Sequence, residues 1–142
     1  MMVLQQFNNS LHLTYPMKTA HDLVNAAKAR IQEIPLNLSE EYIRSVDLLI
    51  DVREADEYNA GHLPGAVFIP RGMLEFKLSA TPELTPRDLN IAVYCKTGGR
   101  SALAALTLQD MGYLNVKSIS GGFDAWVNAG RETIKPKTTS FD

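Results

Sequence analysis

The sequence has only one cysteine, Cys95, among its 142 residues. A single thiol excludes an intramolecular disulfide, and cysteines and histidines do not cluster at the spacing of zinc ligands. We therefore expect neither disulfide bonds nor a metal site. A reducing, cytoplasmic environment suits such a chain.

Long apolar runs and a strong charge of one sign are also missing. No apolar segment approaches the roughly 20 residues of a transmembrane helix. The first 16 residues lack the basic start and apolar core of a secretory signal. Fourteen lysines and arginines against sixteen aspartates and glutamates give a net charge of −2. Broad binding to nucleic acid or to an anionic membrane is therefore not expected.

The composition also lacks the bias of a disordered chain. With 45% apolar and 21% charged residues, the chain can bury a core, and its length suits one domain. We expect this domain to span residues 17–132, with Met17 as an alternative start. Residues 1–16 and 133–142 are expected to be flexible tails.

Hydrophobic periodicity predicts alternating helices and strands. Apolar residues at helical spacing predict a helix capped by Thr19, and Ser39 is expected to cap a second. Apolar runs at 48–52, 66–69 and 91–94 are typical of strands buried on both faces. A strand at 115–119 and helices over 100–111 and up to Gly130 complete the pattern. This order favours an α/β fold with a mainly parallel sheet, in which ligands bind beyond the carboxyl ends of the strands.

The only cysteine lies where such a fold binds its ligands. Cys95 follows the strand 91–94, and a loop leads from it to Arg100 and the next helix. Gly98 and Gly99 can adopt backbone angles closed to other residues, so N–H groups can converge into an anion-binding nest. The helix N-terminus adds unpaired N–H groups and a positive dipole end. These neighbours favour a thiolate, so Cys95 is a candidate nucleophile rather than an ordinary buried thiol.

Two long motifs resemble a known family. The stretches LLIDVREADEYNAGHLPGAVFIP and IAVYCKTGGRSALAALTLQDMGYLNVKSISGGFDAW closely resemble those of single-domain rhodaneses, which are thiosulfate sulfurtransferase-like proteins. The likeness covers roughly residues 19–130. It implies a rhodanese-like three-layer α/β sandwich, with a central, mainly parallel five-stranded sheet and helices on both faces.

The resemblance also implies a reaction in two halves. Cys95 would take the outer sulfur of thiosulfate as a persulfide, release sulfite, and pass the sulfur to a thiol, to cyanide or to a thioredoxin-like protein. It implies no cofactor beyond this covalent persulfide. The loop would bind the substrate through its N–H groups and through the side chains of its two basic residues. The residues implied are Lys96, Thr97, Gly98, Gly99 and Arg100.

The same resemblance implies a role for Asp51 and Arg53. They end the strand that the family places beside the active loop, and we expect them to orient this loop, with Arg53 paired to a nearby carboxylate such as that of Glu54 or Asp56. An exposed ion pair at a strand end is the alternative. His62, in the GHLPGA stretch, is expected to be a turn residue satisfied by backbone rather than a catalytic base.

The length of the loop from Cys95 to Arg100 favours one kind of reaction over another. Four residues separate Cys95 from Arg100, as in sulfurtransferases, whereas the related phosphatases carry five, so sulfur is favoured over phosphate. Without a second cysteine, the sulfur must leave to another molecule. Two alternatives stay open. One is a sulfur carrier or regulatory module serving a protein partner, and the other, less favoured, is a phosphatase or an arsenate reductase.

Overall fold

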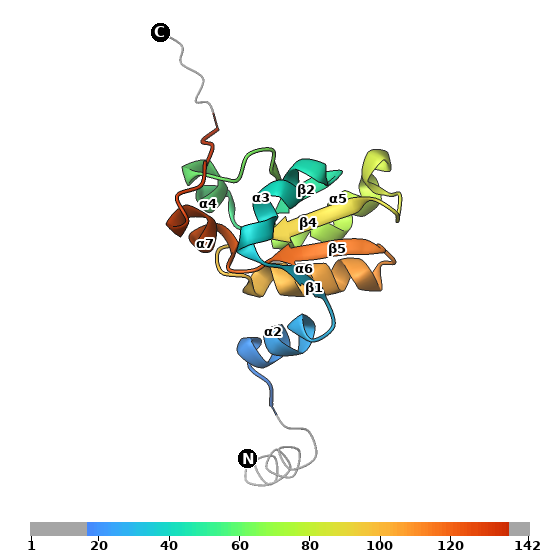
Figure 1. Ribbon diagram of the computed structural model, residues 1–142. Coiled ribbons are helices and arrows are strands. Elements are labelled where there is room, and N and C mark those ends of the chain that lie inside the picture. The colour runs from blue at the N-terminus through green and yellow to red at the C-terminus, as the bar shows by residue number, and fades with distance from the viewer. Residues whose placement is uncertain (1–16, 137–142) are drawn as a thin grey trace.

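A central sheet carries helices on both faces (Figure 1). The computed structural model describes residues 17–136. The strands are β1 (Gln32–Ile34), β2 (Leu48–Asp51), β3 (Val67–Phe68), β4 (Asn90–Tyr94) and β5 (Asn115–Ile119). The helices are α2 (Ala20–Lys28), α3 (Leu36–Ser45), α4 (Ala55–Ala60), α5 (Leu74–Ala80), α6 (Gly99–Asp110) and α7 (Gly122–Asn128), with 3₁₀ helices η1 (Arg71–Met73) and η2 (Pro82–Leu84).

All five strands are parallel, in the order β1-β5-β4-β2-β3. The central strand, β4, aligns Val93 with Ile50 of β2 and with Ser118 of β5. The carboxyl ends of these three strands therefore meet at one edge of the sheet. This confirms the α/β fold with a parallel five-stranded sheet and places Cys95, directly after β4, at the ligand-binding edge.

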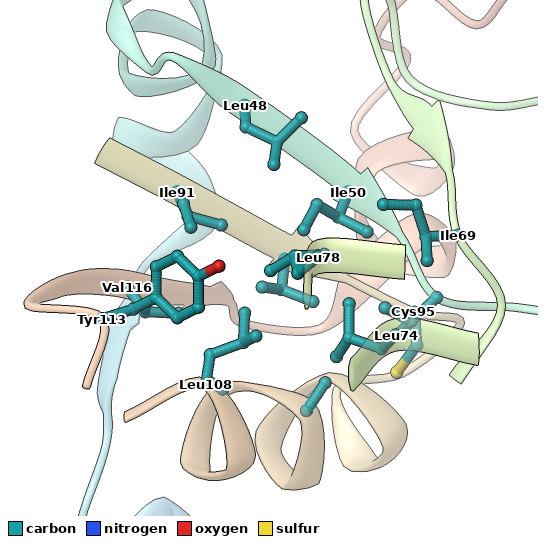
Figure 2. Close-up of a cluster of buried hydrophobic side chains, with 14 residues drawn as sticks. Leu48, Ile50, Ile69, Leu74, Leu78, Ile91, Cys95, Leu108, Tyr113 and Val116 are labelled. Atoms are coloured by element: carbon teal, nitrogen blue, oxygen red, sulfur yellow. The ribbon is translucent and has the colours of Figure 1, made fainter. Parts of the chain in front are cut away.

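Two hydrophobic cores hold the layers together. On one face, side chains of β2 and β4 such as Ile50 pack against Leu74 of α5 and Leu108 of α6 (Figure 2). On the other face, Leu49 and Trp126 join a second cluster with side chains of α3 and α7. The expected three-layer sandwich is confirmed. Helix α2 adds to it by packing against α6 (Figure 1).

The starts of the first two helices test the capping predictions. Thr19 and Asp22 form the expected capping box before α2, with hydrogen bonds of 3.1 and 2.9 Å. The prediction for Ser39 is wrong, because α3 already begins at Leu36. Ser39 lies inside the helix, and its hydroxyl donates to the carbonyl of Leu36 at 2.7 Å.

One strand near the N-terminal end was missed, and the C-terminal end of the domain differs from the expected boundary. Strand β1 was not predicted, because it has three residues of which only Ile34 is buried. Ile134 exchanges two backbone hydrogen bonds of 2.8 Å with His62, so a tail that begins at 133 is wrong for this residue. The remaining predicted tails, 1–16 and 137–142, lie outside the described residues. Within 17–136, every helix is too short or too polar to cross a membrane.

Candidate active site

The thiol of Cys95 lies inside the loop that joins β4 to α6. Its residue is only 1% exposed and sits at one end of the core, beside Leu74 (Figure 2). The N–H of Gly98 donates to Sγ at 3.1 Å. The thiol in turn donates to the hydroxyl of Ser101 at 3.5 Å, which also accepts from Ser118 at 2.8 Å. The loop therefore wraps around the sulfur.

Only one of the two loop glycines uses a backbone conformation that favours glycine. Gly98, the N-cap of α6, has φ 109°, whereas Gly99 is already the first residue of the helix. The expectation that both glycines adopt such angles is wrong for Gly99, because a residue in the helix takes helical angles. The turn that aims the N–H at Sγ therefore depends on Gly98.

The loop is rich in unused backbone donors. The first intrahelical hydrogen bond of α6 runs from the N–H of Ala102 to the carbonyl of Gly98 at 3.1 Å, so the three N–H groups between them have no partner in the helix. Within residues 17–136, the N–H groups of Lys96 and Thr97 also have no hydrogen-bond acceptor. The loop therefore holds one N–H against the sulfur and several more without partners, a combination suited to binding an anion.

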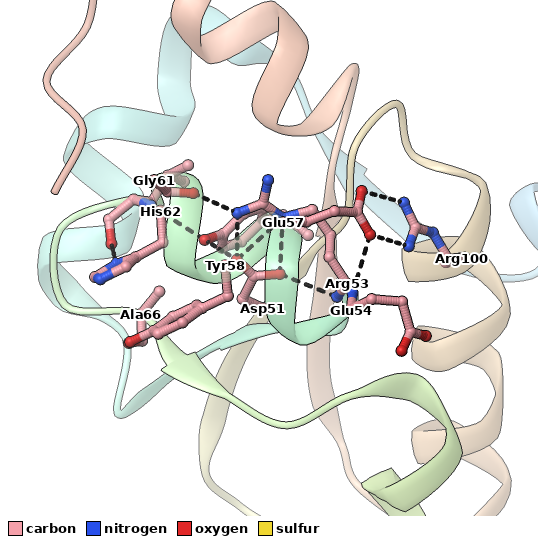
Figure 3. A network of polar contacts seen from close by, with 11 residues as sticks. Asp51, Arg53, Glu54, Glu57, Tyr58, Gly61, His62, Ala66 and Arg100 are labelled. Carbon is pink, nitrogen blue, oxygen red and sulfur yellow. Dashed lines mark hydrogen bonds and ion pairs between the residues drawn. The ribbon is translucent and has the colours of Figure 1, made fainter. Parts of the chain in front are cut away.

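The two basic side chains of the loop are both paired with carboxylates. Lys96 Nζ lies 3.0 Å from Oδ2 of Asp124, on α7. Arg100 binds Glu57 with two hydrogen bonds of 2.7 and 3.0 Å (Figure 3). Hydrogen bonds from Arg100 outweigh burial and lower the pKa of Glu57 to about 2. An anion that enters the loop meets cations already neutralised by neighbours.

Replacing Glu57 by glutamine is expected to lower the free energy of unfolding by about 1 kcal/mol near neutral pH. Because the folded pKa is depressed from 4.5 to about 2, this contribution is complete above pH 4.5 and is lost as the pH falls through about 2. The Glu57 side chain is 24% exposed, so solvent screening keeps the effect small. Urea unfolding of both proteins across this pH range measures it, with Glu83→Gln as the control. A difference that does not narrow in acid contradicts the prediction.

Asp51 and Arg53 form a buried ion pair, 0% and 3% exposed (Figure 3). Arg53 donates from Nε and Nη2 to the Asp51 carboxylate at 2.7–3.1 Å and from Nη2 to the carbonyl of Gly61 at 2.7 Å. Arg53 does pair with a nearby carboxylate, but that carboxylate belongs to Asp51 and not to Glu54 or Asp56, and burial excludes the exposed pair. Burial disfavours the guanidinium cation, but the hydrogen bonds and charge of Asp51 raise its pKa.

This ion pair reaches the loop only through its neighbours. Tyr94, directly before Cys95, donates its hydroxyl to Asp51 at 2.6 Å, and burial, with the Asp51 charge, raises the pKa of Tyr94. The Arg53 guanidinium lies 4.2 Å from the ring centroid of Phe123. In the described part of the chain, neither Asp51 nor Arg53 hydrogen bonds to residues 95–100. Their role in orienting the loop stays a prediction.

Helix α7 supports the loop from the side opposite α6. The carbonyl of Cys95 accepts from Phe123 N–H at 2.8 Å, and that of Lys96 from Asp124 N–H at 3.0 Å. A Cβ on Gly122 would lie 2.5 Å from the Cys95 carbonyl oxygen. Sequence reasoning missed this contact, although two consecutive glycines before a helix were a visible signal.

Two further groups complete the site and its border. His62 Nδ1 is 2.8 Å from the carbonyl of Leu63, and its ring stacks on Tyr58, which agrees with a turn residue satisfied by backbone.

Two serines near the thiol, Ser101 and Ser118, were not predicted. Ser101 contacts the thiol directly, and Ser118 contacts it through Ser101. Ser118 lies in β5, far from Cys95 in the sequence, and has no local signal for this contact, whereas Ser101 lies only six residues after Cys95, in the first turn of α6.

The chain matches the model of the family described as the Rhodanese-like domain over residues 35–129. This match covers more than half of the chain, so the protein belongs to the rhodanese-like domain family. The match begins after α2 and β1 and includes the whole Cys95 loop. The prediction of a rhodanese is therefore confirmed at the level of the family, which contains sulfurtransferases.

Relatives agree with this assignment. The chain is 31% identical to a sulfurtransferase of Allochromatium vinosum over 90 residues, which are 63% of this chain and 80% of that protein. It is 35% identical over 108 residues to the putative sulfur carrier protein YrkF of Bacillus subtilis, covering 75% of this chain and 55% of YrkF. A solved structure from Rhodopseudomonas palustris, a protein of unknown function described as a possible tyrosine phosphatase, superposes with a TM-score of 0.74. The two are 33% identical, over 83% of this chain and 96% of that one.

Proposed function

We propose that the protein transfers sulfane sulfur from thiosulfate, or from a persulfide, through Cys95 to a thiol or to cyanide. The observation that carries this proposal is the position of Sγ, 3.1 Å from the Gly98 N–H inside a short loop of unused backbone donors. A nucleophile and an anion site coincide there, as covalent transfer of a negatively charged group requires.

In the first half-reaction, the Cys95 thiolate attacks the outer sulfur of thiosulfate. The sulfur–sulfur bond of thiosulfate breaks, and its electron pair leaves with sulfite. The cysteine keeps the outer sulfur as a persulfide anion. The N–H groups of Gly98 and of the first turn of α6 would stabilise this negative charge, because they point at the sulfur or have no partner of their own.

In the second half-reaction, the thiolate of an acceptor, or cyanide, attacks the outer sulfur of the persulfide. The electron pair returns to Sγ of Cys95, which regenerates the enzyme. The acceptor leaves as a persulfide or as thiocyanate. The described residues offer Cys95 no second thiol, since it is the only cysteine of the chain, so the acceptor is another molecule.

Intact-mass analysis after exposure to thiosulfate tests the proposal. The wild-type protein is expected to gain the mass of one sulfur atom on Cys95, and added cyanide is expected to remove it as thiocyanate. Cys95→Ser is the matched control, because the two side chains differ in one atom, and it is expected to gain nothing. Absence of the mass gain in the wild type, or an equal gain in the variant, refutes the proposal.

A sulfur-carrier role is the second candidate, supported by the likeness to the putative carrier YrkF. A carrier forms the same persulfide, but it delivers sulfur quickly to one protein partner and only negligibly to small acceptors. A panel of small thiols, cyanide and a thioredoxin-like protein distinguishes the two roles.

The third candidate is a phosphatase or arsenate reductase. Hydrolysis of an aryl phosphate that disappears in Cys95→Ser would support it, against the four-residue loop.

A further inference from the structure

One lysine approaches the active loop from outside the residues that match the family model. Lys28 is the last residue of α2, and its Nζ lies 3.9 Å from the position that a Cβ on Gly98 would occupy. Val24, one turn earlier, has a methyl group 3.6 Å from the corresponding position on Gly99. Because α2 packs along α6, its last turn lies against the end of the Cys95 loop, where α6 begins.

Lys28 differs from the other cations of this region in its partners. Lys96 and Arg100 are held by Asp124 and Glu57. In the part of the chain that the structure describes, Lys28 has no carboxylate within 4.0 Å and no hydrogen bond. It is therefore the basic side chain beside the loop whose charge no neighbouring carboxylate offsets.

Of the two helix ends beside this charge, the N-terminus of α6 disfavours it in the protein without a ligand. A cation beside the N-terminus of a helix opposes the helix dipole, and Gly98 is the N-cap of α6. The same ammonium lies at the C-terminus of α2, where the dipole of that helix favours it, so α2 can hold the lysine there. An anion in the loop would turn the unfavourable contact into a favourable one.

We propose that Lys28 attracts and holds anionic reactants at the Cys95 loop, and so determines the preference for anionic over uncharged reagents. This inference rests on the proposed function, because it names the chemical class of the donor at the same site: a small oxyanion or sulfur anion such as thiosulfate. Lys28 acts through its charge and is not required to touch the transferred sulfur.

The test compares Lys28→Gln, Lys28→Arg and a control, Lys18→Gln, which removes a charge just before the N-cap of α2, at the other end of that helix. The rate constant for persulfide formation on Cys95 with thiosulfate is expected to fall about three- to tenfold in Lys28→Gln. It should stay near the wild-type value in Lys28→Arg and in Lys18→Gln. The loss is expected to shrink as added salt screens the charge.

A second readout does not depend on sulfur transfer. Iodoacetate and iodoacetamide alkylate thiols and have similar size, but only the first is an anion. The ratio of their rates at Cys95 is expected to fall in Lys28→Gln by a similar factor, while the melting temperature stays unchanged or rises. Equal losses with both reagents, or a lowered melting temperature with an unchanged ratio, would show that Lys28 is structural and overturn the inference.

Failure of the inference and failure of the proposed function give different results. If the wild-type protein gains no sulfur from thiosulfate, the proposed function fails, and the alkylation ratio still decides the role of Lys28. Suppose instead that the wild type gains sulfur and that Lys28→Gln forms the persulfide at the same rate at low salt. If its ratio of iodoacetate to iodoacetamide rates is also unchanged, only the inference fails.

Discussion

The Arg53→Met protein is expected to be about 3–5 kcal/mol less stable than the wild type. Methionine fills much of the volume of the arginine stem but cannot pair with the carboxylate of Asp51, which is fully buried. The variant therefore keeps a buried negative charge with only the Tyr94 hydroxyl and one backbone N–H as partners. Urea unfolding near neutral pH measures the loss.

A matched substitution separates the effect of burial from that of losing an arginine. Arg44→Met removes an exposed ion pair with Glu40, 3.4 Å apart, and is expected to cost no more than about 0.5 kcal/mol. In the double variant Asp51→Asn with Arg53→Met, the unpaired charge is gone, so part of the stability should return. A loss for Arg53→Met no greater than that for Arg44→Met contradicts this account.

The partner of Arg53 also shows what could have been read from the sequence. Side chains two residues apart in an extended segment point to the same side, so Asp51 was the geometrically favoured partner. Glu54 and Asp56 are also acidic and close in sequence, but both lie in or at the start of α4. The alternation of side chains along the extended backbone was therefore a stronger signal for the partner of Arg53 than closeness in sequence.

The Cys95 loop itself was predictable because its signals are local. A buried apolar strand, two glycines and an apolar helix follow one another within about twenty residues, and each has a direct structural reading. The pairing of Arg100 with Glu57, 43 positions apart, has no such local signature. It depends on how α4 and α6 come together, as does the approach of Lys28 from α2.

Helices α6 and α7 contact the Cys95 loop in different ways. Helix α6 offers unpaired N–H groups where the loop ends, whereas α7 donates hydrogen bonds to the carbonyls of Cys95 and Lys96. The residue that allows α7 to approach so closely is Gly122. Its φ of 59° and the absence of a side chain are both required at this contact.

Gly122→Ala is accordingly expected to reduce sulfur transfer by at least about 100-fold. The added Cβ would lie 2.5 Å from the Cys95 carbonyl oxygen and 2.7 Å from that of Lys96. Atoms at such distances must move apart, and the neighbours here are backbone atoms of the active loop, which displaces Sγ from the Gly98 N–H. Persulfide formation on Cys95, measured per folded molecule below the melting temperature, reports the loss.

Gly130→Ala is the control for backbone strain alone. Gly130 has a similar φ of 73°, but nothing lies within 4 Å of the position that its Cβ would occupy. This variant is expected to lose about 1 kcal/mol of stability and to keep its activity. If Gly122→Ala transfers sulfur as fast as Gly130→Ala, the contact of α7 does not position the loop. If Gly122→Ala is folded but inactive while Gly130→Ala stays active, the close approach of α7 is what holds the Cys95 sulfur in place.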